Sequence, residues 1–360
     1  MSDTLPAARG IVNVAEINPY APRPFTFTEA AVCLRDAIRA AGYDSEIHVN
    51  RADTSQRCIV LGALPPHLPA VEQLDAKRAA IYNLEQLASD SPLVRDQYKP
   101  WLRNWLVADY HQANLEVLAR ESGGAQRALE LPLVPGPGVA WRPDLPHEPV
   151  VDVLFFGTAS PRRDALLDRV RAAGMTVEVV AGAFGEELAP ALKRARLVLH
   201  VHFYETGLFP IARFLQPVAQ GLPIVCEDSV FSTLSDWSAS GIVFAPYDGL
   251  VDACASLIRS GEERAERARR NREFAAAIDF RTPFERLLRT LEGTPDAAEL
   301  TNFEIEAMLA QDATELPPEA HLPPPPLKMV ERTPGQGRYG VLIVVLLLLF
   351  SIWTIWRATG

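Results

Sequence analysis

The sequence has few of the features that mark several common protein classes. It contains only four cysteines in 360 residues, and no two of them form a CxxC pair. We therefore expect Cys33, Cys58, Cys226 and Cys254 to be buried, reduced thiols in a reducing compartment. Positive charge is also scarce, and the formal net charge of −10 argues against broad nucleic-acid binding.

No secretory signal is predicted, because the polar start MSDTLPAARG is not followed by an apolar run of signal-peptide length. The other end does carry a long apolar run, since 339–356 holds eighteen residues without a charge. As a helix it would be about 27 Å long, enough to cross a bilayer core. Basic residues are more numerous before this run than after it. We therefore expect a single-pass tail anchor, with the large N-terminal part in the cytoplasm.

Two alternatives compete with that anchor. One is a buried core helix, which a run that is apolar on all faces after a Pro-rich stretch disfavours. The other is a helix that packs among other membrane helices. Segment 293–338 precedes the run, and it reads as a possible amphipathic helix followed by an extended proline spacer.

The rest of the chain shows one pattern twice, in 1–149 and in 150–292. Short, nearly continuous apolar runs alternate with stretches of helical periodicity, which is typical of parallel sheets covered on both faces. The predicted fold class is α/β, with two Rossmann-like doubly wound domains in series. The proline-dense segment 129–149 is predicted to be the linker between them.

The most informative stretch is LVLHVHFYETGLFPIARFLQPVAQGLPIVCED, residues 197–228. It predicts a strand, a loop, a helix, a tight Gly-Pro turn and a second strand. Glu205 and Gly207 follow the first strand, and Arg213 lies in the helix. Ligands of open α/β sheets bind at the carboxyl ends of strands. A carboxylate and an arginine at that edge suit a ligand that has both hydroxyls and phosphates, such as a nucleotide sugar.

Other polar residues reach the same predicted edge. His202 lies near the end of the first strand, and Glu227 and Asp228 end the next strand. His200 and His202 share one face, but no third metal-ligating residue is placed nearby in sequence, so no metal site is predicted.

Two glycine loops add candidate ligand contacts. The loop from Gly157 and Thr158 to Arg162 and Arg163 begins a predicted helix, capped by Ser160. Its arginines could neutralise a diphosphate, although a capped helix start explains the rest of the loop. In the second loop, Gly182 and Phe184 could lie along a nucleotide base, and the alternative is a plain strand-to-helix turn.

These residues resemble the GT-B glycosyltransferases, especially a bacterial family 1-like subgroup. The quoted matches are YETGLFPIAR, GLPIVCE, DVLFFGTASPRR and NLEQL (83–87), together with 109–114 and HFYE. The resemblance implies two Rossmann-like domains facing a cleft. It implies that Glu205 contacts the sugar and that the arginines contact the diphosphate. The second glutamate of the family motif falls on Arg213 here, which leaves Glu227 as the candidate ribose contact.

The expected function is therefore a membrane-anchored glycosyltransferase, with a nucleotide-sugar donor as substrate and no separate cofactor. A membrane or envelope acceptor follows only from the predicted anchor. The alternative is a non-catalytic glycosyltransferase-like module that acts as a membrane-tethered interaction protein. A nucleotide-sugar epimerase or dehydrogenase is disfavoured, because neither half has GxGxxG after its first strand.

Overall fold

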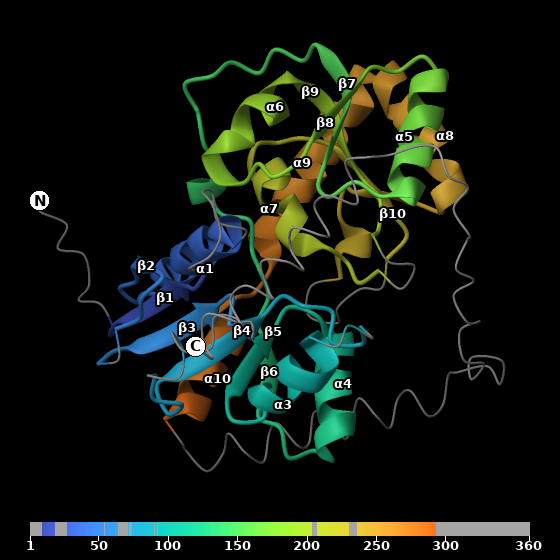
Figure 1. Ribbon diagram of the computed structural model, residues 1–360. Helices are drawn as coiled ribbons and strands as arrows, with labels where there is room; N and C mark the ends of the chain where they lie inside the picture. The colour runs from blue at the N-terminus through green and yellow to red at the C-terminus, as the bar shows by residue number, and fades with distance from the viewer. Residues whose placement is uncertain are drawn as a thin grey trace, which may run out of the picture. The chain divides into compact units, whose positions relative to one another are not determined.

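The computed structural model describes residues 9–18, 27–53, 55–63, 71, 74–89, 91, 93–203, 207–229 and 236–292, all within the compact unit 1–312. They form two parallel sheets with their helices (Figure 1). No helix within these ranges is long and apolar enough to cross a membrane. The predicted anchor at 339–356 and the spacer at 293–338 lie outside the described residues.

The first sheet has six strands in the order β2-β1-β3-β4-β5-β6, and every neighbouring pair is parallel. Val14 of β1 pairs with Ile47 on one side and with Ile59 on the other. The strands are β1 (Val12–Glu16), β2 (Ile47–Val49), β3 (Arg57–Leu61), β4 (Ala79–Asn83), β5 (Leu106–Asp109) and β6 (Ala128–Glu130).

Both faces of this sheet are buried. Val14 and Leu61 belong to one apolar core and Ala15 and Val60 to another, because successive side chains of a strand point to opposite faces. This explains why the strands read as nearly continuous apolar runs. The helices of this half are α1 (Thr28–Ala40), the π-helical turn η2 (Leu93–Tyr98), α3 (Lys99–Leu102), α4 (Gln112–Ser122) and the 3₁₀ turn η3 (Pro137–Val139).

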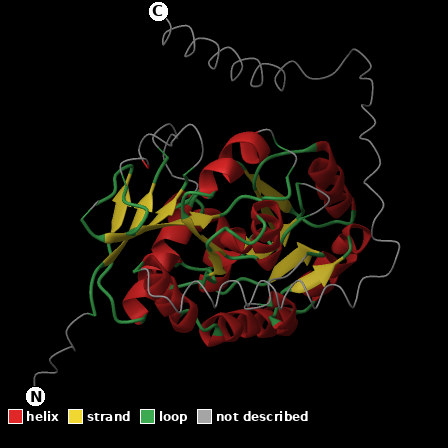
Figure 2. Cartoon of the chain, turned by 90° about the horizontal axis from the view of Figure 1, so that it is seen from below, coloured by secondary structure: helices red, strands yellow, loops and turns green. Residues whose placement is uncertain are grey.

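The second sheet has five parallel strands in the order β11-β10-β9-β7-β8. Its strands are β7 (Val151–Phe156), β8 (Val177–Val180), β9 (Ala195–His200), β10 (Ile224–Glu227) and β11 (Val243–Ala245). Helices flank the strands (Figure 2). They are α5 (Pro161–Ala172), α6 (Ala189–Arg194), α7 (Ile211–Ala219), α8 (Leu250–Arg259), α9 (Gly261–Ala277) and α10 (Arg281–Leu291), with 3₁₀ turns η4 (Gly185–Glu187), η5 (Trp237–Ala239) and η6 (Tyr247–Gly249). The predicted α/β class with two doubly wound sheets is thus confirmed.

The segment 129–149, predicted to be a linker, contains regular structure. Its start belongs to β6, which adds the sixth strand to the first sheet, and Leu131, Leu133 and Val139 are buried in the core. The prolines of this segment interrupt the chain only after the strand has ended, so they do not prevent pairing.

The last described helix returns to the first sheet. α10 contacts α1, β5 and β6, and Arg57 Nη1 donates to Glu292 Oε1 at 2.8 Å. The predicted domain limits of 1–149 and 150–292 stay a prediction. The four cysteines are free and buried, as expected, and burial raises the pKa of the Cys33 thiol to about 12.

Candidate active site

The order of the second sheet creates a crevice at one edge. β7 lies between β8 and β9, so the chain leaves β7 and β9 in opposite directions. In open α/β sheets, ligands bind at such a switch point, outside the carboxyl ends of the strands. A cavity of about 630 Å³ opens there, within the size range of small-molecule sites. Its lining comes from the loops after β7 and β8 and from α7. On the side of the first sheet, Glu29 of α1 and Leu84 and Glu85, which follow β4, also line it.

Gly157 and Arg213 form one wall of this cavity. Arg213 Nη1 donates to the Phe156 carbonyl oxygen at 3.0 Å, which holds the guanidinium against the loop. Gly157 has a φ of +136°, and a Cβ there would lie 2.5 Å from Arg213 Nη1. Only glycine therefore allows this close approach. No carboxylate pairs with Arg213 among the residues the structure describes. Burial lowers its pKa, but an arginine remains charged at neutral pH.

Arg163 has a structural role that the sequence did not indicate. Its side chain is 2% exposed, and its Nε and Nη1 donate to the carbonyl oxygens of Val201 and Thr158 at 2.9 and 2.7 Å. The guanidinium thus ties the loop after β7 to the end of β9. Burial, with the nearby charges of Arg213 and Arg162, lowers its pKa to about 10. It therefore still contributes positive charge to this edge.

The start of α5 is capped as predicted. Ser160 Oγ accepts from the Arg163 backbone N–H at 3.3 Å, and Pro161 is the first helical residue. The N-terminus of α5 thus follows directly on Thr158 and Ala159, which line the cavity, and a helix N-terminus favours an anion.

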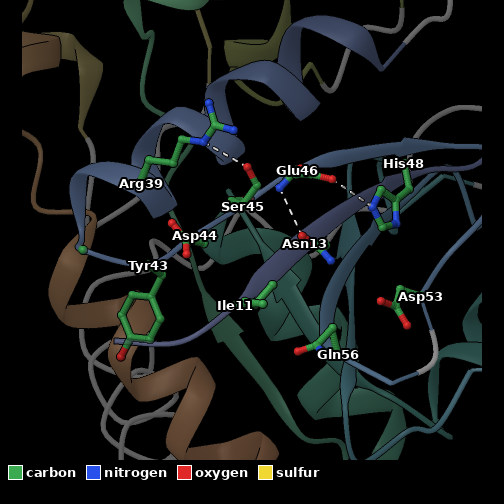
Figure 3. Close-up of a pocket in the computed structure, with 11 residues that line it drawn as sticks. Ile11, Asn13, Arg39, Tyr43, Asp44, Ser45, Glu46, His48, Asp53 and Gln56 are labelled. Atoms are coloured by element: carbon green, nitrogen blue, oxygen red, sulfur yellow. Dashed lines mark hydrogen bonds and ion pairs between the residues drawn. The ribbon is translucent and has the colours of Figure 1, made fainter. Parts of the chain in front are cut away.

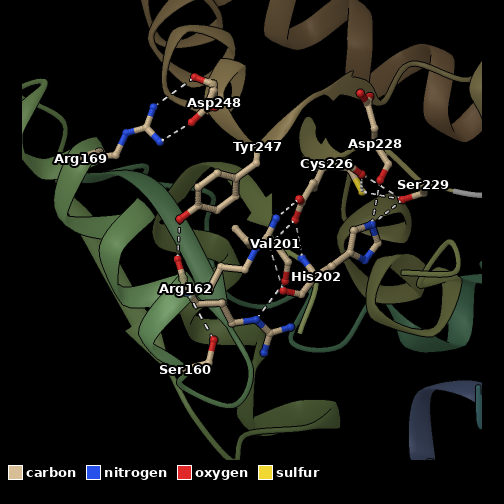
Figure 4. A network of polar contacts seen from close by, with 12 residues as sticks. Ser160, Arg162, Arg169, Val201, His202, Cys226, Asp228, Ser229, Tyr247 and Asp248 are labelled. Carbon is tan, nitrogen blue, oxygen red and sulfur yellow. Dashed lines mark hydrogen bonds and ion pairs between the residues drawn. The ribbon is translucent and has the colours of Figure 1, made fainter. Parts of the chain in front are cut away.

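Arg162 pairs with Glu227 across the sheet edge. Figure 4 shows Arg162 beside Tyr247 and His202. Arg162 Nη1 donates to Glu227 Oε2 at 2.8 Å, and the guanidinium lies 4.1 Å from the ring centre of Tyr247. The His202 backbone N–H also donates to Glu227, at 2.9 Å. Burial disfavours the carboxylate, but these donors outweigh it and lower the pKa of Glu227. Two predicted ligand contacts are thus bonded to each other.

His202 is held in place by its surroundings. Its Nε2 lies 3.0 Å from the Asp228 carbonyl oxygen and 3.0 Å from Ser229 Oγ. A Cβ at Gly207 would lie 2.0 Å from His202 Nδ1, so Gly207 leaves the space that this ring fills. Burial lowers the pKa of His202, which keeps the ring neutral at pH 7.

A second cavity of about 350 Å³ adjoins the first. His202, His200 and Gln86 line it, and Thr158 and Arg213 line both cavities. Glu205 belongs to 204–206, which lie outside the described residues.

The predicted site residues fall into three groups. Five line the larger cavity, two more line only the smaller one, and two pair with each other at the edge of β10. They are, in that order, Gly157, Thr158, Gly182, Phe184 and Arg213; Arg163 and His202; and Arg162 and Glu227.

The first sheet contributes carboxylates that sequence reasoning missed. Glu85 lines the larger cavity, and burial raises its pKa. The loop that carries Glu85 is held by helix α4, because Asn114 Nδ2 donates to the Glu85 carbonyl oxygen at 2.9 Å. Asn114 also contacts Asp109, which accepts from Asn83 Nδ2 at 2.6 Å. The signal available in the sequence was the pair of polar strand ends, Asn83 and Asp109.

Glu29 joins the two sheets. Its Oε1 accepts from the Gly185 backbone N–H at 2.6 Å, and the side chain lines the larger cavity. Burial raises its pKa to about 7. Glu16, at the end of β1, has a pKa raised to about 7 by burial, even though Thr28 donates to it at 3.0 Å. Glu29 lies within helix α1, and no neighbouring residue in the sequence indicates that it lines a cavity.

A third cavity, of about 840 Å³, lies at the opposite edge of the first sheet (Figure 3). Ile11 and Asn13 line it from the start of β1, and Asp44 and Glu46 line it from the residues before β2. We do not place the active site there, because ligands of such sheets bind at the carboxyl ends of strands. Within the described ranges, no group of three or more His, Cys, Asp and Glu side chains is placed to hold a metal ion.

Comparison with protein-family models gives no match. Among curated proteins, two uncharacterized proteins of Acanthamoeba polyphaga mimivirus are similar to part of the chain. One is 33% identical over 115 residues, or 31% of this chain, and the other is 26% identical over 110 residues, or 30% of it. The matched segments span only 13% and 36% of those relatives.

Among solved structures, the chain is similar to TarM, with a TM-score of 0.48 and 13% identity over 67% of this chain and 55% of that one. It is similar to T4 phage BGT in complex with UDP and Mn²⁺, with a TM-score of 0.48 and 12% identity over 80% of this chain and 99% of that one. It is also similar to Anabaena HepE in complex with UDP and glucose, with a TM-score of 0.49 and 12% identity over 79% of this chain and 100% of that one. These values are too low to transfer any chemistry to this chain.

Proposed function

We propose that the chain is a glycosyltransferase that moves a sugar from a nucleotide-sugar donor to an acceptor hydroxyl. The observation that carries the proposal is the cavity at the switch point of the second sheet. Arg213, the Gly157 loop and Glu85 all line it. The motif resemblance over 150–228 supports the same assignment.

The second sheet would bind the donor diphosphate. Arg213 borders both cavities, and the N-terminus of α5 ends beside the same loop. The difficult part of sugar transfer is the negative charge that develops on the leaving diphosphate. A guanidinium and helix amides already fixed in position stabilise that charge without reorganisation. Arg163 adds charge from beneath the loop.

The first sheet would activate the acceptor. A general base must be near the acceptor hydroxyl and have a pKa close to the working pH. Glu85 is the candidate, since it lines the cavity and burial raises its pKa above the usual value of a glutamate. Its neighbour Gln86 lines the smaller cavity, so these two residues border both spaces. We assign Glu85 as the base that takes the proton from the acceptor.

Three predictions from the sequence remain part of the proposal. Glu205 would contact the transferred sugar. Glu227 would contact the ribose only after releasing Arg162, with which it now pairs. The apolar run at 339–356 would anchor the protein in a membrane, with 1–292 in the cytoplasm and a membrane or envelope acceptor.

A second candidate is a non-catalytic glycosyltransferase-like module that acts as a membrane-tethered interaction protein. The pairing of Arg162 with Glu227 favours it, because a residue predicted to hold the diphosphate is bonded within the protein. Sugar turnover separates the two candidates.

The test is to incubate the purified full-length protein with UDP- and GDP-sugars and to measure release of the nucleoside diphosphate, with water or an added alcohol supplying the hydroxyl that accepts the sugar. A transferase releases one of them, and release stops in the Glu85→Gln variant while nucleotide binding persists. Binding without release would support the non-catalytic module. A folded protein that neither binds nor releases a nucleotide would contradict the transferase and favour the interaction protein.

A further inference from the structure

A fourth cavity, of about 650 Å³, lies at the amino-terminal ends of strands in the first sheet. Arg57 begins β3, Arg78 directly precedes β4, and Arg127 directly precedes β6. This cavity shares no lining residue with the larger cavity of the candidate active site, which lies at the carboxyl ends. Its charged lining is mostly basic, with Arg57, Lys77, Arg78 and Arg127 against Asp75 and Glu292.

Lys77 and Arg127 are the two cations of this lining that have no carboxylate partner among the residues that the structure describes. Both side chains are exposed. Each of the two carboxylates that line the cavity lies within ion-pair distance of another arginine. A hollow lined mainly by one sign of charge concentrates the field of that charge and attracts the opposite sign. The cavity is therefore suited to bind a group that carries negative charge.

The chain that follows α10 leaves the helix at this cavity. Leu291 is 4% exposed and Glu292 accepts from Arg57 at 2.8 Å, so the point of exit is fixed beside the basic lining. Residues 293–327 lie outside the described residues, and their sequence has seven Asp and Glu residues but no Lys or Arg. The first of these acids, Asp296, comes four residues after Glu292, and four residues span at most about 14 Å. Its carboxylate is thus always within reach of the cavity.

We propose that the acidic segment 296–306 binds in this cavity through Lys77 and Arg127. A group on so short a tether is present at an effective concentration of about millimolar, whereas a free anion must compete from solution. An anionic membrane surface would first meet the repulsion of the acids in 293–327. Binding would hold the start of the linker at the amino-terminal ends of the first sheet, away from the candidate active site. The inference does not depend on the proposed function.

The test is cross-linking of the full-length protein with a water-soluble carbodiimide, which joins a lysine amine to a carboxylate only where the two are in direct contact. The chain has only four lysines, so each cross-linked peptide identifies its lysine by mass spectrometry. We expect monomeric protein to give cross-links from Lys77 to acidic residues of 296–306. Lys193, on helix α6 of the second half, is the internal control and should give none to this segment.

A substitution that leaves every reactive group in place tests the role of the cavity. Arg127→Gln removes one of the unpaired cations, so the yield of the Lys77 cross-link should fall about 2- to 5-fold, as for the loss of one exposed ion pair. Arg120→Gln is the matched control, because Arg120 is an exposed arginine of α4 that does not line the cavity. It should leave the yield unchanged. Salt at 1 M, where the screening length is about 3 Å, should lower the yield in the wild type.

A second readout needs no cross-linker. A protease that cuts after glutamate has sites at Glu299, Glu304 and Glu306, and binding in the cavity should slow cleavage there. Lys77→Gln removes a charge and should be cut about 2- to 5-fold faster than the wild type. Lys77→Arg keeps the charge and should be cut at the rate of the wild type.

The proposal is overturned if Lys77 gives no cross-link to 296–306 in monomeric protein, or if Arg127→Gln gives the same yield as Arg120→Gln. Cross-links found only in covalent dimers also overturn it, because the occupant would then be the segment of a second copy. Equal cleavage of Lys77→Gln, Lys77→Arg and the wild type would show that the charge of the cavity does not hold the segment.

Discussion

The two sheets share a topology but differ in the charge that they present at their carboxyl ends. Both have the order 2-1-3-4-5, with a sixth strand in the first. The edge of the first sheet carries carboxylates, including the half-buried Glu85 and the buried Asp109, whose pKa values are raised by burial. The edge of the second carries Arg163 and Arg213 beside Gly157. In the proposed function, the same strand order would supply a proton acceptor from the first sheet and an anion site from the second.

The largest effect is expected from a substitution beside the first sheet, which would remove the proposed proton acceptor. Glu85→Gln keeps the size of the side chain but removes the base, so kcat should fall about 10²- to 10⁴-fold. The Kd of the nucleoside diphosphate should stay unchanged, because Glu85 does not hold the phosphates. Steady-state transfer and calorimetry on the same preparation measure the two quantities. A variant with wild-type kcat would exclude Glu85 as the base.

The next effect is on the second sheet. Gly157→Ala places a Cβ against Arg213 at a φ of +136°, so it should cost about 1–3 kcal/mol of unfolding free energy and weaken nucleotide binding. Gly174→Ala is the matched control, since Gly174 also has a positive φ, +86°, but no atom lies within 4 Å of its Cβ position. Urea unfolding and nucleotide titration of both variants check this. Equal affinity in the two variants would show that contact with Arg213 does not matter.

The smallest effect concerns the contact between the sheets. The pKa of Glu29 is raised by burial to about 7, above its usual value of 4.5. Between those values the folded protein keeps a proton that the unfolded chain has released, so stability falls as pH rises. Glu29→Gln removes this loss. We expect the variant to match the wild type near pH 5 and to be more stable by about 1–3 kcal/mol at pH 8.

Urea unfolding at the two pH values measures this difference. Glu16 is the charged neighbour of Glu29, and its pKa is also about 7, so Glu16→Gln in the same background tests whether the two groups titrate together. A stability difference of the same size at pH 5 and pH 8 would contradict the account.

The sequence predicted what depends on local chemistry. The Ser160 cap, the strand run 151–156 and the Gly221-Pro223 turn into β10 each have their signal in adjacent residues. The strand β6 was not predicted, because it is only three residues long and the proline-dense segment that follows it indicated a linker.

The site itself was harder to predict, because its contacts join distant segments. Glu29 meets Gly185 across 156 residues, and the role of Arg163 is visible only through the carbonyl oxygens of Val201 and Thr158.

The most direct test of the central claim is a calorimetric titration of the full-length protein with UDP and GDP, before and after Arg213→Gln. Arg171→Gln is the control, because Arg171 is an exposed arginine of α5 that pairs with Asp168 at 2.8 Å. We predict that one nucleotide binds, that Arg213→Gln weakens it about 10-fold or more, and that Arg171→Gln does not change it. Equal affinity in all three proteins would contradict a donor site at the edge of the second sheet.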